Sequence, residues 1–457
     1  MPILHPVVGK PHAKEQLYIG YHTTLYLSSS YSKHSFTYNR LMNKPLKQKT
    51  ILHMDGDAFF VGVEIAKNPK LRGLPVVTGE ERGIVSALSY EAKALGVVRG
   101  MPIFRIKKEF PTVRILPGDY SAYAKYSQMM FDIVRRYADD VEEYSIDECF
   151  ADLTGLDRPL KMSYRQIAEK IKEEINKEMD LSISIGVAPT KVLAKVASKW
   201  IKPNGLTVIE PDTAIDFLKK VSIEKIWGIG PSTTDFLRKR NIRFASDFST
   251  KNIEWIKENL PKPYEAIWYE LNGIAVMGIN ADPKVEYSSI QKTRSFYPAS
   301  SDRVFLFSQL SKHIEDACTK ARHFSLSTRK VSIFLKTKDF RYFTYSFVLP
   351  IPTSTPESII SFSEKFFDKI YNEKTLYRTT GVTLHSLISD ASAQIDLFGE
   401  SERVNKLESI HERIDLLDNK YGKRTVYLAS THNAIKYRKN NVMGTDSEDL
   451  DRDLLFL

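Results

Sequence analysis

The chain has 457 residues, which is enough for several domains. Hydrophobic residues make up 42% and charged residues 27%, as in a globular protein, and the formal net charge of +10 favours a polyanionic partner such as nucleic acid. Its two cysteines, Cys149 and Cys318, exclude a disulfide framework and a cysteine-based zinc site. No apolar run approaches the length of a membrane span, so we expect a cytoplasmic protein without a membrane partner.

Residues 1–49 differ from the rest of the chain. They are rich in Tyr, Ser, His and Lys, and Glu15 is their only acid. We interpret them as a poorly ordered N-terminal extension. A basic arm that touches DNA and an organellar targeting peptide are the alternatives.

The next part of the chain holds two short stretches that pair carboxylates with strand-forming residues. In the first, H-M-D-G-D-A-F-F (53–60), Asp55 and Asp57 would point the same way from a strand. In the second, Y-S-I-D-E-C-F-A-D-L (144–153), Asp147 and Glu148 are adjacent, so both reach one site only at a turn or strand end. Carboxylates that converge from two strands repel one another unless a cation neutralises them, and oxygen ligands suit Mg²⁺. Ordinary strand-end acids are the alternative for either stretch alone.

Strand and helix patterns alternate around these stretches, which favours an α/β arrangement. We expect strands at 50–55, 75–78, 83–87, 141–153 (a pair or one bent strand) and 182–187, and helices at 59–66, 90–95, 120–137, 165–179 and from 191. Beyond residues 202–205 the pattern becomes helical. There Lys225–Pro231 predicts a tight turn that resembles the hairpin of a helix-hairpin-helix motif. The resemblance implies that Gly228 and Gly230 expose backbone N–H groups to a DNA phosphate, and the alternative is a commonplace turn.

The C-terminal half predicts a second α/β unit after a connector at 277–289. Strands near 292–296, 330–338, 340–349 and 376–387 and helices near 304–323 and 356–371 give a four-stranded sheet with helices on one face. Basic residues lie on or beside these strands and would either grip phosphates or form a solvated face: Lys336, Lys338, Arg341 and Arg378.

The last segment begins Q-I-D-L-F (394–398) and continues with apolar residues at helical spacing: Val404, Leu407, Ile410, Ile414 and Leu417. Beyond Lys439 the chain is polar, then acidic, and it ends in the apolar residues 454–457.

The two acidic stretches, together with S-Y-E-A-K-A-L-G-V-V-R-G-M-P (89–102), G-V-A-P-T-K-V-L-A-K (186–195), K-P-N-G-L (202–206) and W-G-I-G (227–230), resemble the Y-family (translesion) DNA polymerases, most closely the polymerase IV branch of bacterial type. The resemblance implies an α+β multidomain fold with right-hand architecture (palm, fingers and thumb) and a four-stranded α/β little-finger domain. The implied bounds are 50–58 and 120–198 for the palm, 59–119 for the fingers, 199–276 for the thumb with its helix-hairpin-helix, 277–289 for a linker, 290–388 for the little finger and 389–457 for a C-terminal tail.

The resemblance also implies the metal site. Asp55, Asp147 and Glu148 match the family's catalytic carboxylates, and Gly56 would offer its backbone carbonyl to metal. Two Mg²⁺ ions, for which Mn²⁺ could substitute, would be held there for nucleotidyl transfer to a primer 3′-hydroxyl. Asp57 is assigned a supporting role.

Residues matching the family's nucleotide site lie close to these acids. Phe60 falls at the steric gate that selects deoxynucleotides, and Phe59 beside it fits a core position better. Tyr90, Lys93 and Lys191 match positions that grip the incoming triphosphate, although each lysine could simply be a solvated helix residue.

Q-I-D-L-F resembles a bacterial sliding-clamp peptide in which Gln394, Leu397 and Phe398 make the contacts. The implied function is low-fidelity, template-directed translesion synthesis by a monomer that binds primer-template DNA, deoxynucleoside triphosphates and the clamp. A non-catalytic, clamp-bound scaffold of polymerase shape is the alternative, and a palm-type nucleotide cyclase is disfavoured by Phe60, by the G-I-G turn and by the four-stranded C-terminal unit.

Overall fold

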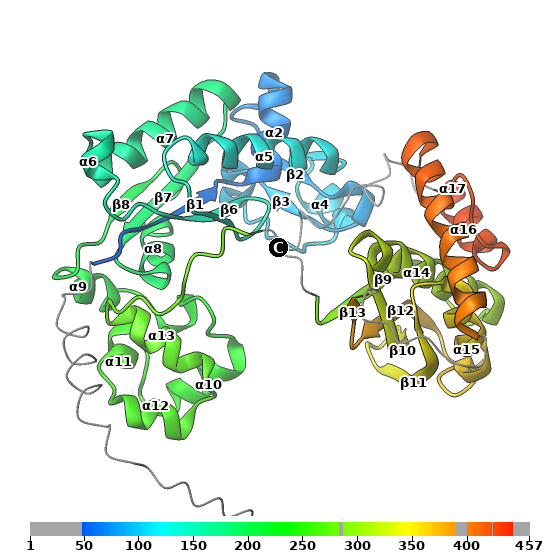
Figure 1. The fold of residues 1–457 in the computed structure, drawn as a ribbon. Coiled ribbons are helices and arrows are strands. Elements are labelled where there is room, and N and C mark those ends of the chain that lie inside the picture. The colour runs from blue at the N-terminus through cyan, green and yellow to red at the C-terminus, as the bar shows by residue number, and fades with distance from the viewer. Residues whose placement is uncertain (1–47, 283–286, 390–399, 423, 442–457) are drawn as a thin grey trace, which may run out of the picture. The chain divides into compact units, whose positions relative to one another are not determined.

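The computed structural model describes residues 48–282, 287–389, 400–422 and 424–441 (Figure 1). The fold below is that of the unit Lys49–Leu457. The expected N-terminal extension falls almost wholly outside the described residues.

A five-stranded sheet in the order β5-β6-β1-β7-β8 carries the first half of the described chain. Its strands are β1 (Ile51–Gly56), β5 (Val141–Glu143), β6 (Glu148–Asp152), β7 (Ile183–Ala188) and β8 (Leu206–Val208). Every residue of the central strand β1 is buried, because helices cover both faces of the sheet (Figure 1). Leu52 and Met54 pack with α5 (Tyr120–Arg135) and α7 (Tyr164–Met179), and Ile51 packs with α8 (Lys191–Ser198) on the other face.

Gly186 allows α8 to lie close against the sheet. A Cβ atom at this position would stand 2.2 Å from the carbonyl oxygen of Ala194 and 2.2 Å from the backbone nitrogen of Ser198. Only glycine avoids that overlap with the helix backbone. The close approach brings the lysines of α8 to the edge of the sheet where the acids lie.

A small three-stranded sheet, β3-β2-β4, follows the first acidic stretch. It consists of β2 (Val76–Thr78), β3 (Ala87–Leu88) and β4 (Arg114–Leu116), with α2 (Phe59–Lys67), α3 (Tyr90–Ala94) and α4 (Ile103–Glu109). Its own core forms around Val77, Val97 and Ile106.

A helical segment comes next, and it shares a core with α8. It consists of α9 (Ala214–Leu218), α10 (Pro231–Arg238), α11 (Ala245–Ser249), α12 (Ile253–Asn259) and α13 (Pro263–Leu271). The short helix α6 (Asp157–Leu160) is not part of this segment and lies between β6 and α7. Trp227, before α10, donates a hydrogen bond from Nε1 to the Tyr144 hydroxyl at 2.9 Å, which ties this segment to the β5–β6 connection.

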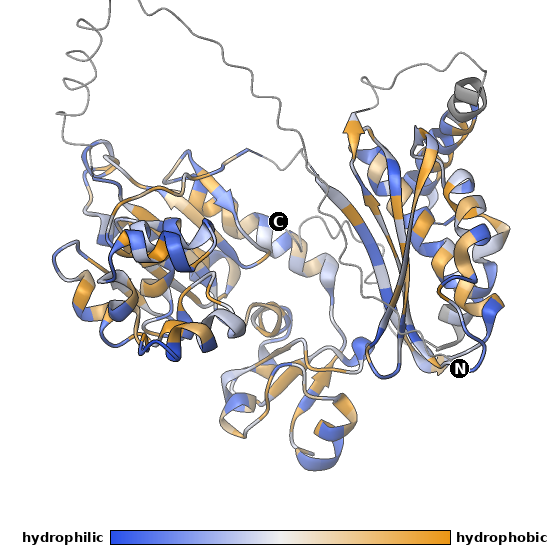
Figure 2. Ribbon diagram, turned by 90° about the horizontal axis from the view of Figure 1, so that it is seen from below, coloured by the Kyte–Doolittle hydropathy of each residue, from blue (hydrophilic) through white to orange (hydrophobic). Residues whose placement is uncertain are grey.

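The C-terminal body has a four-stranded sheet in the order β11-β10-β12-β9, and the short β13 (Ile388–Ser389) pairs with β10. The strands are β9 (Ser289–Ser300), β10 (Leu326–Thr337), β11 (Tyr342–Thr353) and β12 (Tyr377–His385). Helices α14 (Arg303–His323) and α15 (Pro356–Phe367) bury their apolar residues against it, and orange marks the hydrophobic positions in Figure 2. Two further helices, α16 (Glu400–Tyr421) and α17 (His432–Asn441), belong to the same body.

The expected strand-helix order of both halves is confirmed, with three corrections. Of the expected strand 83–87 only Ala87 lies in a strand, β3, and Ile84 makes just an isolated bridge to Pro102. The segment 206–208 is a strand rather than the start of a helical region, since it pairs with β7. The sequence analysis also missed α4 and β4. In the part of the chain that the structure describes, no helix is both long and apolar enough to cross a membrane.

Candidate active site

The two acidic stretches meet on neighbouring antiparallel strands. Asp55 of β1 lies directly opposite Glu148 of β6, and the backbone N–H of Gly56 donates to the carbonyl oxygen of Asp147 at 2.8 Å. The chain bends at residues 145–147 between β5 and β6. This bend is the turn that the sequence predicts, and because of it two adjacent acids lie beside the same strand.

Burial controls the charge of these carboxyl groups. It raises the pKa of Asp55 to about 7; Lys202 opposes the rise, and a hydrogen bond shared with Glu148 adds to it. Burial also disfavours ionised Glu148, but the bond to Asp55 and the charge of Lys195 outweigh it and lower the pKa of Glu148. Within the pair, a proton is therefore favoured on Asp55 rather than on Glu148. Burial raises the pKa of Asp147 as well, although the Ser145 hydroxyl donates to its carboxylate at 2.7 Å.

Two lysines compensate the acids. Lys202 contacts Asp55 through its ammonium group and lies 3.5 Å from a carboxylate oxygen of Asp57. Lys195 Nζ is 2.8 Å from Glu148 Oε2 and 4.2 Å from the ring centroid of Tyr144. The sequence analysis assigned a role to neither residue, although both lie in motifs quoted there. These lysines supply positive charge at the position where the sequence predicts bound cations.

Asp57 is held by the protein itself. Its carboxylate accepts hydrogen bonds from Ser182 Oγ (2.8 Å), Ser184 Oγ (2.9 Å) and the backbone N–H of Asn204 (2.7 Å). The side chain is only 1% exposed. Through these contacts Asp57 stabilises the turn after β1. The sequence analysis assigned this residue a supporting role.

Lys191, expected at the triphosphate, bonds to other partners in this structure. Its ammonium group makes an ion pair with Glu142 at 2.7 Å and donates to the carbonyl oxygen of Gly278 at 3.3 Å. The residue is 5% exposed. In this structure the Lys191 ammonium group therefore bonds to Glu142 and Gly278, near the Phe150 ring that Lys195 also approaches, whereas Lys202 contacts Asp55.

The residues expected at the nucleotide site surround the start of α2. Phe60 is half-buried and stacks on Tyr123, with ring centroids 4.4 Å apart, whereas Phe59 is 4% exposed and packs in the core. Burial, the charges of Asp57 and Asp55, and a hydrogen bond to Asp57 raise the pKa of Tyr90. Lys93 is exposed one turn later, with its ammonium group 5.9 Å from the Tyr90 ring centroid.

The three acids fit a divalent cation by their chemistry. They are oxygen donors on adjacent backbone, and the ammonium groups of Lys195 and Lys202 offset their negative charge here. Within the described ranges, no set of three or more potential ligands stands in the arrangement of an assembled metal site. Gly56 relieves crowding at the site, because an added Cβ would lie 3.2 Å from Phe59 Cβ.

The candidate DNA contacts lie in two places. Gly228 has a φ of +89°, which side chains rarely adopt, and Gly230 caps the N-terminus of α10. In the C-terminal body, Lys336 and Arg378 flank the exposed ring of Phe340, at 4.8 and 4.7 Å from its centroid.

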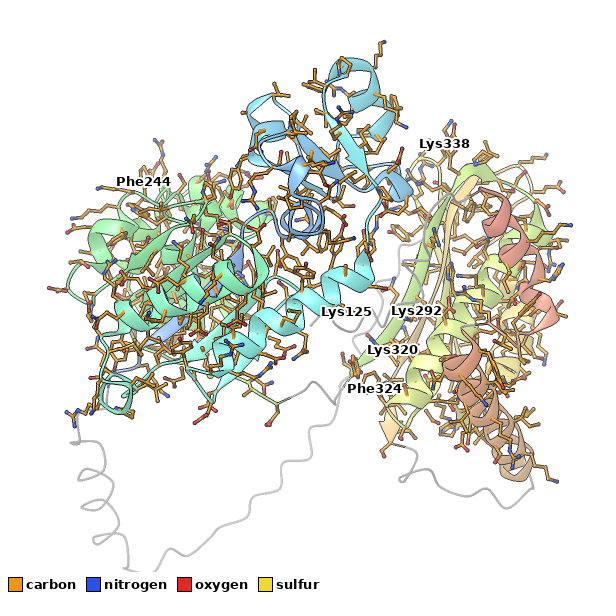
Figure 3. The ribbon with its side chains drawn as sticks, turned by 90° about the horizontal axis from the view of Figure 1, so that it is seen from above. Lys125, Phe244, Lys292, Lys320, Phe324 and Lys338 are labelled. Atoms are coloured by element: carbon orange, nitrogen blue, oxygen red, sulfur yellow. The ribbon has the colours of Figure 1, made fainter. Side chains whose placement is uncertain are left out.

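Arg341 is exposed next to Phe340, and Lys338 extends from the same β10–β11 connection (Figure 3). The sequence analysis did not single out Phe340, although exposed aromatic residues beside basic ones are a usable signal for nucleic-acid contact; Tyr342 and Phe343 follow it and are also exposed. The expected clamp contacts Gln394, Leu397 and Phe398 lie outside the described residues.

Comparisons with known proteins agree with this architecture. The impB/mucB/samB family model matches residues 54–199, and the model of its C-terminal domain matches residues 287–397. The chain is 30% identical over 407 residues to "DNA polymerase IV 1" of Bacillus subtilis (strain 168), covering 88% of this chain and 97% of that protein. It is 31% identical over 389 residues to "DNA polymerase IV" of Desulfatibacillum aliphaticivorans, covering 83% of this chain and 96% of that protein.

Among solved structures, a "Y-family DNA polymerase chimera Dbh-Dpo4(243-245)-Dbh" superposes with a TM-score of 0.62 at 24% identity, over 74% of this chain and 99% of the other. That likeness supports the fold. The two family models and the relatives show that this chain belongs to the impB/mucB/samB family, the Y-family of DNA polymerases.

Proposed function

We propose that this protein is a template-directed DNA polymerase of low fidelity that synthesises DNA past damaged bases. The observation that carries the proposal is the pairing of Asp55 on β1 with Glu148 on β6. The backbone carbonyl of Asp147 accepts a hydrogen bond from Gly56 beside them. Its substrates are primer-template DNA and deoxynucleoside triphosphates.

Polymerases of this family depend on divalent cations, and we infer two Mg²⁺ ions held by Asp55, Asp147, Glu148 and the Gly56 carbonyl. Such ions lower the pKa of a primer 3′-hydroxyl and neutralise charge on the triphosphate. The protein contributes prepositioned ligands: Lys195 keeps Glu148 ionised, and the anchored Asp57 holds the turn that presents Asp55.

Residues at the start of α2 and α3 would select the incoming nucleotide. The ring of Phe60, braced by Tyr123, would close the space beneath the sugar against a 2′-hydroxyl. Tyr90 and Lys93 would contact the triphosphate. Lys191 would also contact the triphosphate, and Lys202, which already lies against Asp55, is a second candidate for that contact.

The DNA would be held by the domains that the resemblance implies. We assign the palm, fingers, thumb and little finger the bounds given above and extend the palm sheet to β8. The turn at Gly228 and Gly230 would bind backbone phosphate, as would Lys336, Arg341 and Arg378. We further propose a monomer in the cytoplasm that engages a bacterial sliding clamp through residues 394–398.

Primer extension by the purified chain with Mg²⁺ tests the proposal. Asp147→Asn and Glu148→Gln should each lower extension by more than 100-fold while DNA affinity stays within about twofold. Asp152→Asn, on the same strand β6, is the matched control and should remain active. Extension retained by both variants would remove the metal-site assignment, and an inactive wild-type chain that still binds DNA would favour the non-catalytic scaffold.

A further inference from the structure

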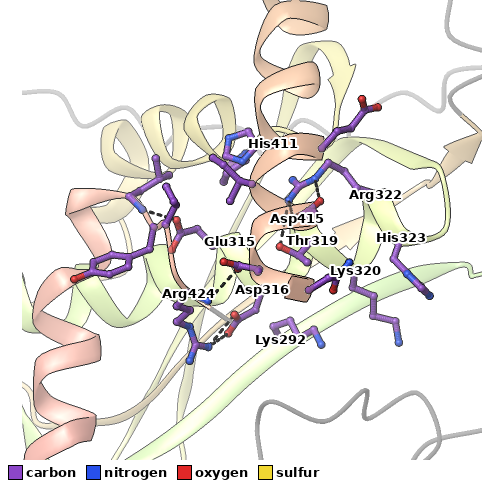
Figure 4. A pocket seen from close by; sticks show the side chains of 18 of the residues that line it. Lys292, Glu315, Asp316, Thr319, Lys320, Arg322, His323, His411, Asp415 and Arg424 are labelled. Carbon is purple, nitrogen blue, oxygen red and sulfur yellow. Dashed lines mark hydrogen bonds and ion pairs between the residues drawn. The ribbon is translucent and has the colours of Figure 1, made fainter. Parts of the chain in front are cut away.

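Helix α16 attaches to the C-terminal body through polar side chains. Asp415 receives two hydrogen bonds from Arg322 of α14, at 2.7 and 2.8 Å (Figure 4). His411 pairs with Glu357 of α15 at 2.8 Å. Glu408 accepts from Ser354 at 3.4 Å. A cavity of about 550 Å³ with many charged lining residues lies between α14 and α16. The face that α16 turns toward its own body is therefore the charged one.

The apolar residues of α16 form a separate stripe. Leu407, Ile410, Ile414, Leu417 and Tyr421 recur at alternating intervals of three and four, the repeat that places side chains on one seam of a helix. Three of them are well exposed: Ile410 by 52%, Leu417 by 40% and Tyr421 by 64%. At about 1.5 Å per residue the stripe is roughly 21 Å long. Such a seam on a helix is the usual contact surface for a second apolar segment.

Basic residues border the outer edge of this stripe. Lys406, Arg413 and Lys420 follow one another every seven residues, each directly before a stripe position, and all three are exposed. A partner segment that covers the stripe would contact this row of basic residues along one side. The row therefore favours a partner that carries carboxylates beside its apolar residues.

The last residues of the same chain have this chemistry. The sequence 448–457 reads E-D-L-D-R-D-L-L-F-L, with Leu450, Leu454 and Leu457 at helical spacing and four acids among them. We propose that residues 448–457 dock on the α16 stripe, with their leucines on the apolar seam and their carboxylates beside Lys406, Arg413 and Lys420.

The chain has the length to make this contact. The segment from 442 to 457 follows α17 directly and is 16 residues long, so it can extend by up to about 50 Å. Helix α17 is anchored in the same body, where the backbone N–H of Ala434 donates to Ser308 of α14 at 2.8 Å. A second copy of the chain would place the basic rows of two α16 helices near each other, which is less favourable than the acidic segment.

Disulfide trapping in the full chain tests the proposal. The native Cys149 and Cys318 are fully buried, so cysteines introduced by Leu417→Cys and Leu454→Cys report their own contact. The pair should form an intramolecular disulfide at least fivefold faster than the matched pair Ser409→Cys and Leu454→Cys, because Ser409 is exposed on α16 but lies off the stripe. Adding Arg413→Glu and Lys420→Glu should remove that preference.

Hydrogen exchange supplies a second readout that needs no cysteine. Replacing Leu450, Leu454 and Leu457 together by serine should speed exchange in residues 407–421 by about tenfold, with primer extension unchanged. Equal trapping of the two cysteine pairs, or unchanged exchange, would overturn the proposal. A disulfide that links two chains, with a dimer in solution, would overturn it in favour of a second copy.

Discussion

Replacing Asp55 by asparagine should stabilise the protein while abolishing synthesis. Asp55 is 10% exposed at its side chain, and burial raises its pKa from the usual 3.8 to about 7. A carboxyl group whose pKa rises on folding holds its proton more tightly in the folded state. Its contribution to stability is therefore fully present below about pH 4 and is lost as the pH rises to about 7.

The size of the effect follows from the shift. A rise of about 3 units at about 1.4 kcal/mol each corresponds to roughly 4 kcal/mol as an upper limit. Glu148 shifts in the opposite direction, because Lys195 and the shared hydrogen bond favour its charge, so part of the cost is recovered within the pair. We expect Asp55→Asn to raise the free energy of unfolding by about 2 kcal/mol at pH 8 and by less than about 1 kcal/mol at pH 5.

Urea unfolding at both pH values, with a chelator present, measures this difference. The comparison variant is Asp57→Asn, two residues away, whose carboxylate accepts three hydrogen bonds from the protein. It should lose about 2–3 kcal/mol at pH 8, since hydrogen bonds to buried charged groups are worth about 1.5–3 kcal/mol each. A loss of stability in Asp55→Asn as large as that in Asp57→Asn would refute the reasoning.

Three further outcomes are expected. Phe60→Ala should admit ribonucleotides, with a ribo- to deoxynucleotide preference changed by at least about tenfold, or about 1.4 kcal/mol; unchanged discrimination in single-nucleotide insertion would place the gate elsewhere. Lys202→Met should raise the KM for the incoming nucleotide more than Lys191→Met does, because only Lys202 lies against Asp55. The reverse order in steady-state kinetics would favour Lys191 as the main contact to the triphosphate. Deleting residues 394–398 should lower clamp-stimulated synthesis and leave synthesis without clamp unchanged; equal stimulation would contradict the clamp contact.

Local pattern was sufficient to predict most elements and the two acidic stretches. The apolar run before Asp55 is a buried strand, and both Asp55 and Asp57 reach Lys202, although Asp57 lies in the turn after the strand and not on it. The adjacency of Asp147 and Glu148 required a bend, and the chain bends there. These features follow from periodicity and backbone geometry, which neighbouring residues determine.

Contacts between distant segments decided the rest. Lys202 meets Asp55 across 147 positions of sequence, and Lys195 meets Glu148 across 47, so neither pairing is visible in a local pattern. The same holds for β8, a three-residue strand that exists by pairing with β7, and for α16, whose charged face is buried while part of its apolar stripe stays exposed. Sequence alone showed which residues bear the chemistry. The tertiary structure decided which lysine serves which acid, because ion pairing depends on distance in space.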